Sequence, residues 1–97
     1  MPAYVISEVK VLDADLAERY RPLAAATIAQ YGGRYIVRAG EVDLFEGERD
    51  PAKRFVIVEF PTMDRARAWY HSPEYAEALK IRQAGALERT LVFVEGV

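Results

Sequence analysis

His71 has the side chain best suited to proton transfer in this chain. It is the single histidine and follows Trp69 and Tyr70 in the segment AWYHSPEY. An imidazole titrates near neutral pH, so His71 is a candidate general acid or base. The alternative is a histidine at a helix end that satisfies backbone carbonyls. One histidine without any cysteine offers too few ligands for zinc or iron, and we expect no metal or other cofactor.

Glu59 and Arg38 are the second pair of candidates. Glu59 is the one charged residue in the apolar run 55–60. A carboxylate on a covered face has a raised pKa unless it is paired, and a raised pKa suits a base that works near neutrality. Arg38 is a candidate to bind a substrate carboxylate through two hydrogen bonds. An ion pair between these two residues, across neighbouring strands or across a dimer, is an equally open interpretation.

Three further side chains, Trp69, Tyr75 and Arg82, are candidates to bind a substrate. Tyr75 falls in the first turn of a predicted helix, from which its hydroxyl can point toward a pocket that His71 also reaches. Packing in the core is the alternative for the aromatic residues, and a solvated helix face is the alternative for Arg82. No Gly-rich phosphate loop, GxSxG, CxxC or HExxH motif occurs, which argues against nucleotide hydrolases, serine hydrolases and zinc peptidases.

The composition is typical of an ordinary globular protein. With 97 residues the chain is long enough for one core, so we expect a single domain over residues 1–97. Thirteen basic residues stand against 15 acidic ones without a basic cluster, so we expect no nucleic-acid partner. No apolar run approaches the roughly 20 residues that span a bilayer, and the first residues alternate like a strand. We therefore expect no membrane partner and a cytoplasmic location.

Four strands are predicted from apolar alternation or apolar runs. The expected ranges are residues 4–11, 34–39, 54–60 and 91–94. The apolar residues between 42 and 45 can prolong the second strand, and the segment EGERDPAK then forms a hairpin loop into the third. The second and third strands should therefore pair antiparallel.

The helices are predicted from caps and three- or four-residue spacing. The first should begin near Asp13 or Asp15, kink or restart at Pro22 and end at the Gly pair 32–33. Its expected inward stripe consists of Leu16, Tyr20, Leu23 and Thr27. Thr62 should cap a second helix, and Ser72 should cap a third that starts at Pro73 and ends near Gly85.

This order of elements predicts an α+β protein of the ferredoxin-like βαββαβ type. Such a fold has a four-stranded antiparallel sheet with the helices on one face and strands one and three in the middle. The helix-facing residues should include Val5, Val9, Val56, Val58 and Phe60. The opposite face should carry Tyr4, Ile6, Glu8, Arg38, Phe55, Ile57, Glu59, Leu91 and Phe93. A face this apolar predicts that a second copy packs against the sheet as a homodimer.

Four segments carry a resemblance to a known family. They are YGGRYIVRAG at 31–40, FVIVEFP at 55–61, AWYHSPEY at 68–75 and VFVEG at 92–96. On these segments the chain resembles the family of domain of unknown function 1330, within the dimeric α+β barrel superfamily. The resemblance covers nearly the whole chain. It implies a ferredoxin-like subunit, a face-to-face dimer and a separate pocket in each subunit, but no agreed reaction.

Two functional hypotheses follow from these residues. The first is a cofactor-independent enzyme that acts on a small organic acid or aromatic compound by proton transfer. Arg38 would bind the anionic group, and Glu59 or His71 would move the proton. The alternative is a non-catalytic dimeric module for ligand binding or structure, in which the Arg and Glu side chains stabilise the interface. The sequence alone does not separate these hypotheses, because buried ion pairs and catalytic groups use the same residue types.

Overall fold

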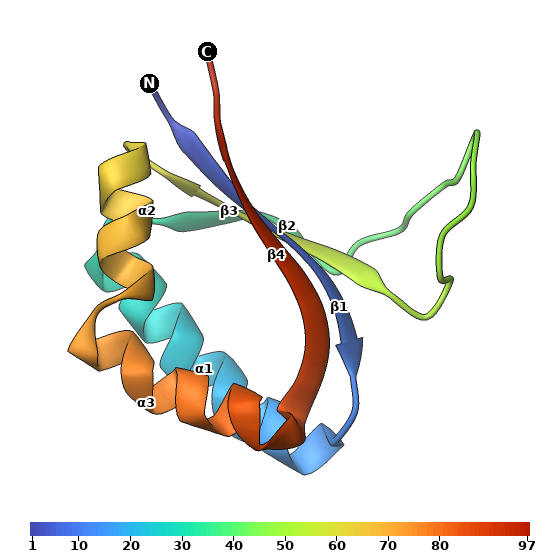
Figure 1. The fold of residues 1–97 in the computed structure, drawn as a ribbon, viewed down its shortest axis with the longest axis horizontal. Helices are drawn as coiled ribbons and strands as arrows, with labels where there is room; N and C mark the ends of the chain where they lie inside the picture. The colour runs from blue at the N-terminus through green and yellow to red at the C-terminus, as the bar shows by residue number, and fades with distance from the viewer.

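The computed structural model describes residues 1–97 as one sheet covered on one face by helices (Figure 1). The order of neighbouring strands is β2-β3-β1-β4, and all three pairings are antiparallel. This confirms the predicted ferredoxin-like α+β fold with strands one and three in the centre. The elements are β1 (Ala3–Val11), α1 (Ala14–Gln30), β2 (Arg34–Arg38), β3 (Arg54–Phe60), α2 (Met63–Tyr70), α3 (Pro73–Ile81), a π-helical turn (Arg82–Ala86) and β4 (Leu87–Glu95).

The helix starts follow the predicted caps. The Asp13 side chain accepts a hydrogen bond from the Leu16 amide at 3.1 Å, so Asp13 and not Asp15 caps α1. Thr62 and Ser72 cap α2 and α3 in the same way. None of these helices combines the length and the apolar character needed to cross a bilayer.

The buried face of α1 differs from the predicted stripe at one position. Tyr20 and Thr27 are buried as expected, but Leu23 is 43 % exposed. The other buried residues of α1 are Ala17, Ala24 and Ile28. Pro22 lies within one helix that runs from Ala14 to Gln30, so it does not restart the helix.

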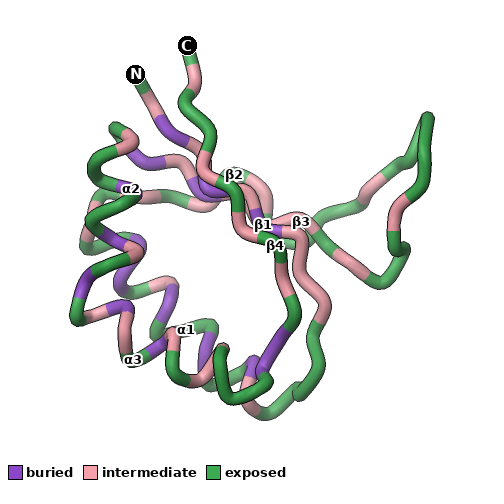
Figure 2. Tube along the Cα trace, viewed as in Figure 1, coloured by how far each residue is buried: buried purple, intermediate pink, exposed green.

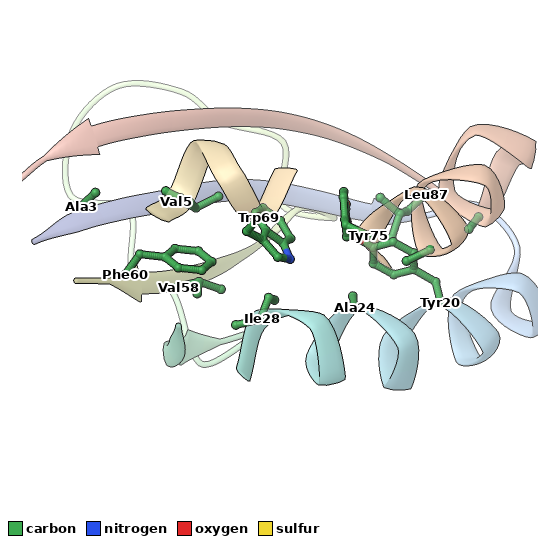
Figure 3. Close-up of a cluster of buried hydrophobic side chains, with 13 residues drawn as sticks. Ala3, Val5, Tyr20, Ala24, Ile28, Val58, Phe60, Trp69, Tyr75 and Leu87 are labelled. Carbon is green, nitrogen blue, oxygen red and sulfur yellow. Dashed lines mark hydrogen bonds between the residues drawn. The ribbon is translucent and has the colours of Figure 1, made fainter. Parts of the chain in front are cut away.

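The core lies between the sheet and the helices. Buried residues follow the surfaces of α1, α2 and α3 that face one another and the strands (Figure 2). Phe60, Trp69 and Tyr75 form its aromatic centre, with ring centroids 5.5 Å apart for the first two and 4.3 Å apart for the last two (Figure 3). Such tilted ring pairs add to the free energy gained from burying apolar area.

The segment between β2 and β3 contradicts the sequence prediction. Residues 39–53 contain no strand, and they project from the body of the molecule as an extended loop (Figure 1). Phe45, expected to prolong the strand, is 91 % exposed. Near its return to β3 the loop is held by Arg49, which donates to Glu8 at 2.9 Å and lies 4.6 Å from the Phe55 ring centroid.

The last strand is longer than predicted. β4 begins at Leu87, four residues before the expected start at Leu91. Its register with β1 pairs Val5 with Phe93 and Ser7 with Leu91. Leu91 and Phe93 therefore face the helices, and their placement on the opposite face was wrong. The apolar runs of a buried strand do not tell its two faces apart, which explains the error.

Candidate functional site

A cavity of about 460 Å³ opens between the sheet and α1. Its volume suits a small organic ligand. β1 and β3 provide an apolar floor that includes Val5, Val9, Val56 and Val58. On the other side, α1 and α2 contribute Tyr20, Arg21, Ala24, Ile28 and Trp69.

The floor of the cavity follows directly from the strand register. Arg38, Val56, Ser7 and Leu91 are consecutive neighbours in one row across the four strands. In the next row, Val9 lies between Arg54 of β3 and Arg89 of β4. The two arginines therefore flank the floor at a separation of two strand spacings, or about 10 Å between Cα atoms.

The charged residues of the cavity are all cationic. Fourteen of its 20 lining residues are hydrophobic, and the others are Ser7, Lys10, Arg21, Arg38, Arg54 and Arg89. None of these five cations forms an ion pair. The five ion pairs in the structure join Arg34 to Glu59, Arg49 to Glu8, Lys53 to Glu88, Arg67 to Asp64 and Lys80 to Glu77. A protein of net charge −2 thus carries an unbalanced positive cavity.

Arg89 and two tyrosines form a compact cluster at the buried part of this cavity. The two terminal nitrogens of Arg89 donate to the Tyr20 hydroxyl at 3.0 Å and to the Tyr75 hydroxyl at 2.6 Å. The two hydroxyl oxygens lie 2.7 Å apart and share a hydrogen bond. Figure 3 shows Tyr20 and Tyr75 together beside Leu87, at the end of the core opposite Phe60. No carboxylate balances Arg89 in this cluster.

The protonation states of the cluster follow from its burial. Desolvation and the neighbouring Tyr20 raise the pKa of Tyr75 well above its usual value, so its hydroxyl stays protonated. Burial by itself lowers the pKa of Arg89, but the two tyrosines outweigh this effect and raise it. The cluster therefore joins a guanidinium cation to a Tyr75 phenol that stays neutral.

Two further side chains give the cavity polar contacts. Ser7 is 5 % exposed, lies in the middle of the floor and forms no side-chain hydrogen bond within the protein. Its hydroxyl is thus free to bind a group in the cavity. Tyr35 also lines the cavity, and the Arg38 guanidinium lies 4.3 Å from its ring centroid. Burial raises the pKa of Tyr35, so this phenol is neutral as well.

Arg38 and Glu59 do not share a face, contrary to the sequence prediction. Arg34 pairs with Glu59 and Tyr35 with Val58, but the next pair joins Val37 to Ile57. Ile36 is left unpaired in a β-bulge, which shifts the alternation by one residue. Arg38 therefore faces the helices and the cavity.

Glu59 lies on the outer face of the sheet, with Arg34. Its carboxylate accepts a hydrogen bond from Arg34 Nε at 2.8 Å. This contact holds the pKa of Glu59 below its usual value, against the opposing effect of burial, and the Tyr4 hydroxyl adds to the lowering. The expectation of a raised pKa was wrong, because the carboxylate is paired.

The other predicted site residues are divided between the cavity and the surface. Trp69 lines the cavity, and Tyr75 belongs to the Arg89 cluster. His71 is exposed at the end of α2 and borders a separate shallow hollow. Arg82 lies in the π-helical turn outside the cavity, and its buried Nε has no hydrogen-bond partner. No group of three or more His, Cys, Asp or Glu side chains is placed to hold a metal ion.

Tyr20 and Arg89 were not among the predicted site residues. Tyr20 was predicted only as a core residue of the first helix, and Arg89 was placed before the last strand. Alternation places Arg89 on the same face as Leu87, Leu91 and Phe93, so finding it required both an earlier strand start and the correct face for that strand.

The sequence matches one family over residues 2–97, described as domain of unknown function DUF1330. The chain belongs to the DUF1330 family. No curated protein matches the sequence.

Solved structures share the fold at low sequence identity. A protein of unknown function from Rhodopseudomonas palustris is 18% identical with a TM-score of 0.79, over 99% of this chain and 82% of that one. SnoaB, a cofactor-independent oxygenase from Streptomyces nogalater, is 16% identical with a TM-score of 0.70, over 99% and 93% of the two chains. A dimeric protein of ferredoxin-like fold from Bacteroides fragilis is 18% identical with a TM-score of 0.65, over 98% and 96%.

Proposed function

We propose that this DUF1330 protein is a cofactor-independent enzyme that acts on a small organic acid or aromatic compound by proton transfer. The observation that carries the proposal is the apolar cavity with five cations, no carboxylate and no ion pair. Unpaired cations in a partly desolvated site attract an anion, while the apolar walls accept a hydrocarbon body. The fold of SnoaB supports the assignment, because it is described as an oxygenase that needs no cofactor.

Each part of the ligand has a matching part of the cavity. Arg38 is positioned on the floor row and fixed over the Tyr35 ring, so it is the proposed ligand of the carboxylate. Trp69 is the proposed wall for the apolar body. The hydroxyl-bearing side chains that line the cavity are Ser7, Tyr20 and Tyr35. Glu59 and His71 lie outside the cavity, so the hydroxyl groups of the cavity are the proposed groups for proton transfer.

A thermal-shift scan against small aliphatic and aromatic carboxylates tests the proposal. A ligand that binds only the folded state, at about 100 times its dissociation constant, stabilises by roughly 2.7 kcal/mol, which raises the melting temperature by many degrees. Arg38→Ala should abolish this ligand-induced shift. Arg34→Ala is the matched control, because it removes an arginine of the same strand from the opposite face and should keep the shift.

Turnover of the compounds that bind then tests the catalytic part. Glu59→Gln and His71→Ala should both retain activity, since neither side chain reaches the cavity. Saturable shifts in wild type and Arg38→Ala alike would refute the role of Arg38. Binding without any turnover would favour the alternative, a non-catalytic ligand-binding module.

A specific observation favours an assembly for either function. The outer face of the sheet is not covered by any helix, and it exposes Val92 and Val94 to 46% and 44% beside the Ile6 and Ile57 pair. We propose that a second copy covers this face, as the dimeric description of the Bacteroides fragilis protein suggests. Light scattering should give twice the chain mass, and Val92→Glu should halve it.

A further inference from the structure

We infer that the cluster of Tyr20, Tyr75 and Arg89 is an oxyanion subsite that binds a single ligand oxygen, such as that of a phenolate or an enolate. The inference rests on the proposed function, because it names the ligand chemistry of the same cavity. Three observations support it: the cluster has one more hydroxyl proton than acceptors for it, the terminal nitrogens of Arg89 are occupied, and the Ser7 hydroxyl has no side-chain hydrogen bond.

The cluster has one hydroxyl proton more than it uses. Both tyrosine oxygens accept from Arg89, and one hydroxyl donates to the other. Two phenols carry two protons, so one remains without an acceptor. Tyr75 is fully buried with no other acceptor within reach, whereas Tyr20 lines the cavity. Burying an unused donor is costly, so Tyr75 donates to Tyr20, and the free proton belongs to Tyr20.

The free Tyr20 proton is a strengthened donor. Its oxygen accepts hydrogen bonds from the Arg89 cation and from Tyr75, and both contacts draw electron density away from the hydroxyl group. A donor of this kind binds a negatively charged oxygen more tightly than a neutral one. Tyr20 is therefore placed to stabilise an ionised oxygen inside the cavity.

The cluster does not suit a carboxylate. A carboxylate binds arginine best through two parallel hydrogen bonds from two nitrogens. In Arg89 both terminal nitrogens already point at the tyrosine oxygens, which occupy the positions that two carboxylate oxygens would take. The end of Arg89 that carries its two terminal nitrogens is thus occupied, and the Tyr20 hydroxyl supplies one donor to one ligand oxygen. Carboxylates are left to the exposed arginines of the cavity, Arg21, Arg38 and Arg54.

Ser7 gives independent support for a ligand at this depth. Ser7 lines the floor one row from Val9 and Arg89, and its hydroxyl is open to the cavity without a side-chain hydrogen bond to the protein. A polar group in this position is satisfied when a ligand oxygen reaches it. The ligand class is thus a flat apolar compound with one acidic hydroxyl or enolisable carbonyl at the buried end and an anionic group at the arginine-rich end.

A chromogenic phenol measures the charge of the bound oxygen directly. The reporter is 4-nitrophenol, whose ionised form absorbs at a longer wavelength than the neutral form. In wild type the bound reporter should ionise at a lower pH than the free reporter. Tyr20→Phe should move this ionisation back toward the free value by about one to two pH units, the effect of one hydrogen bond to a charged group. Tyr31→Phe is the matched control, because Tyr31 bonds Glu74 outside the cavity.

The outcomes separate the subsite from the proposed function. Equal ionisation in wild type and Tyr20→Phe refutes the subsite, while carboxylate binding through Arg38 can still hold. Tyr75→Phe should keep most of the change in the ionisation pH of bound 4-nitrophenol. Complete loss of this change in Tyr75→Phe would mean that Tyr75 carries the free proton, and it would refute the assignment to Tyr20. If Tyr20→Phe does not fold, wild type alone decides. Its affinity must be higher for 4-nitrophenolate than for 4-nitroanisole, which has no ionisable oxygen, and equal affinities refute the subsite.

Discussion

The hydrogen bond between Trp69 and Thr27 is expected to stabilise the packing of α2 on α1. The indole N–H donates to the Thr27 hydroxyl at 3.0 Å, and that hydroxyl in turn donates to the Ala24 carbonyl at 2.9 Å. Trp69 is 2% exposed and Thr27 is 7% exposed, so water cannot replace the bond freely. Thr27→Val keeps the shape of the side chain and leaves the indole N–H buried without an acceptor.

The expected loss is about 2 kcal/mol, within the range for one unsatisfied buried donor. Valine and threonine have similar helix propensities, so the backbone contributes little to the difference. For a domain of this size, such a loss lowers the melting temperature by roughly 10 °C. Trp69 is the single tryptophan, so its fluorescence reports urea unfolding of the wild type and of Thr27→Val without interference.

A double-mutant cycle separates the hydrogen bond from other effects. In the Trp69→Phe background the indole N–H is absent, so no donor is left without an acceptor. There Thr27→Val should lower the free energy of unfolding by only a few tenths of a kcal/mol, measured by circular dichroism. The same loss in both backgrounds would refute the reasoning. It would mean that the hydroxyl stabilises the protein through its bond to Ala24 and not through the indole.

Two further predictions concern the sheet and its edges. The pKa of Glu59 is below its ordinary 4.5, so its carboxylate stabilises the fold above pH 4.5 and this stabilisation is lost as the pH falls. The free energy of unfolding, measured over an acid titration, should therefore decline less steeply in Glu59→Gln than in wild type. Parallel curves for the two proteins would contradict the ion pair. A Cβ at Gly33 would lie 2.7 Å from a Phe60 ring carbon, so Gly33→Ala should cost about 1–3 kcal/mol in urea unfolding, whereas Gly40→Ala, with nothing within 4 Å, should cost far less.

The fold was predictable because its signals are local. Strand alternation, the caps at Thr62 and Ser72 and the order of elements all depend on residues close in sequence. The loop of residues 39–53 was not predicted, because Val42, Leu44 and Phe45 match a strand pattern that no neighbouring strand pairs with. A strand needs a partner, and the partner is not visible in the segment itself.

The site was predictable only in part. Arg38, Trp69 and Tyr75 were chosen for their side-chain types, and all three lie in or against the cavity. The Tyr20 and Arg89 contact joins residues 69 positions apart, and it depends on the register of β4. The register of a strand decides which of its residues face the helices. The apolar run of a buried strand is compatible with more than one register, so the sequence alone did not place Arg89.

The unpaired Ile36 gives this protein a way to change its ligand preference without exchanging an amino acid. Arg34 and Arg38 would share a face in a regular strand, and the one extra residue sends one outward to Glu59 and the other into the cavity. Deleting Ile36 would remove the bulge and leave the two arginines on opposite faces, whereas pairing Ile36 in a regular strand would turn Arg38 outward and leave the cavity one cation poorer. β2 is an edge strand restrained by one neighbour, and bulges are common at sheet edges. The pairing of this one residue therefore sets the charge of the cavity as well as the shape of the sheet edge.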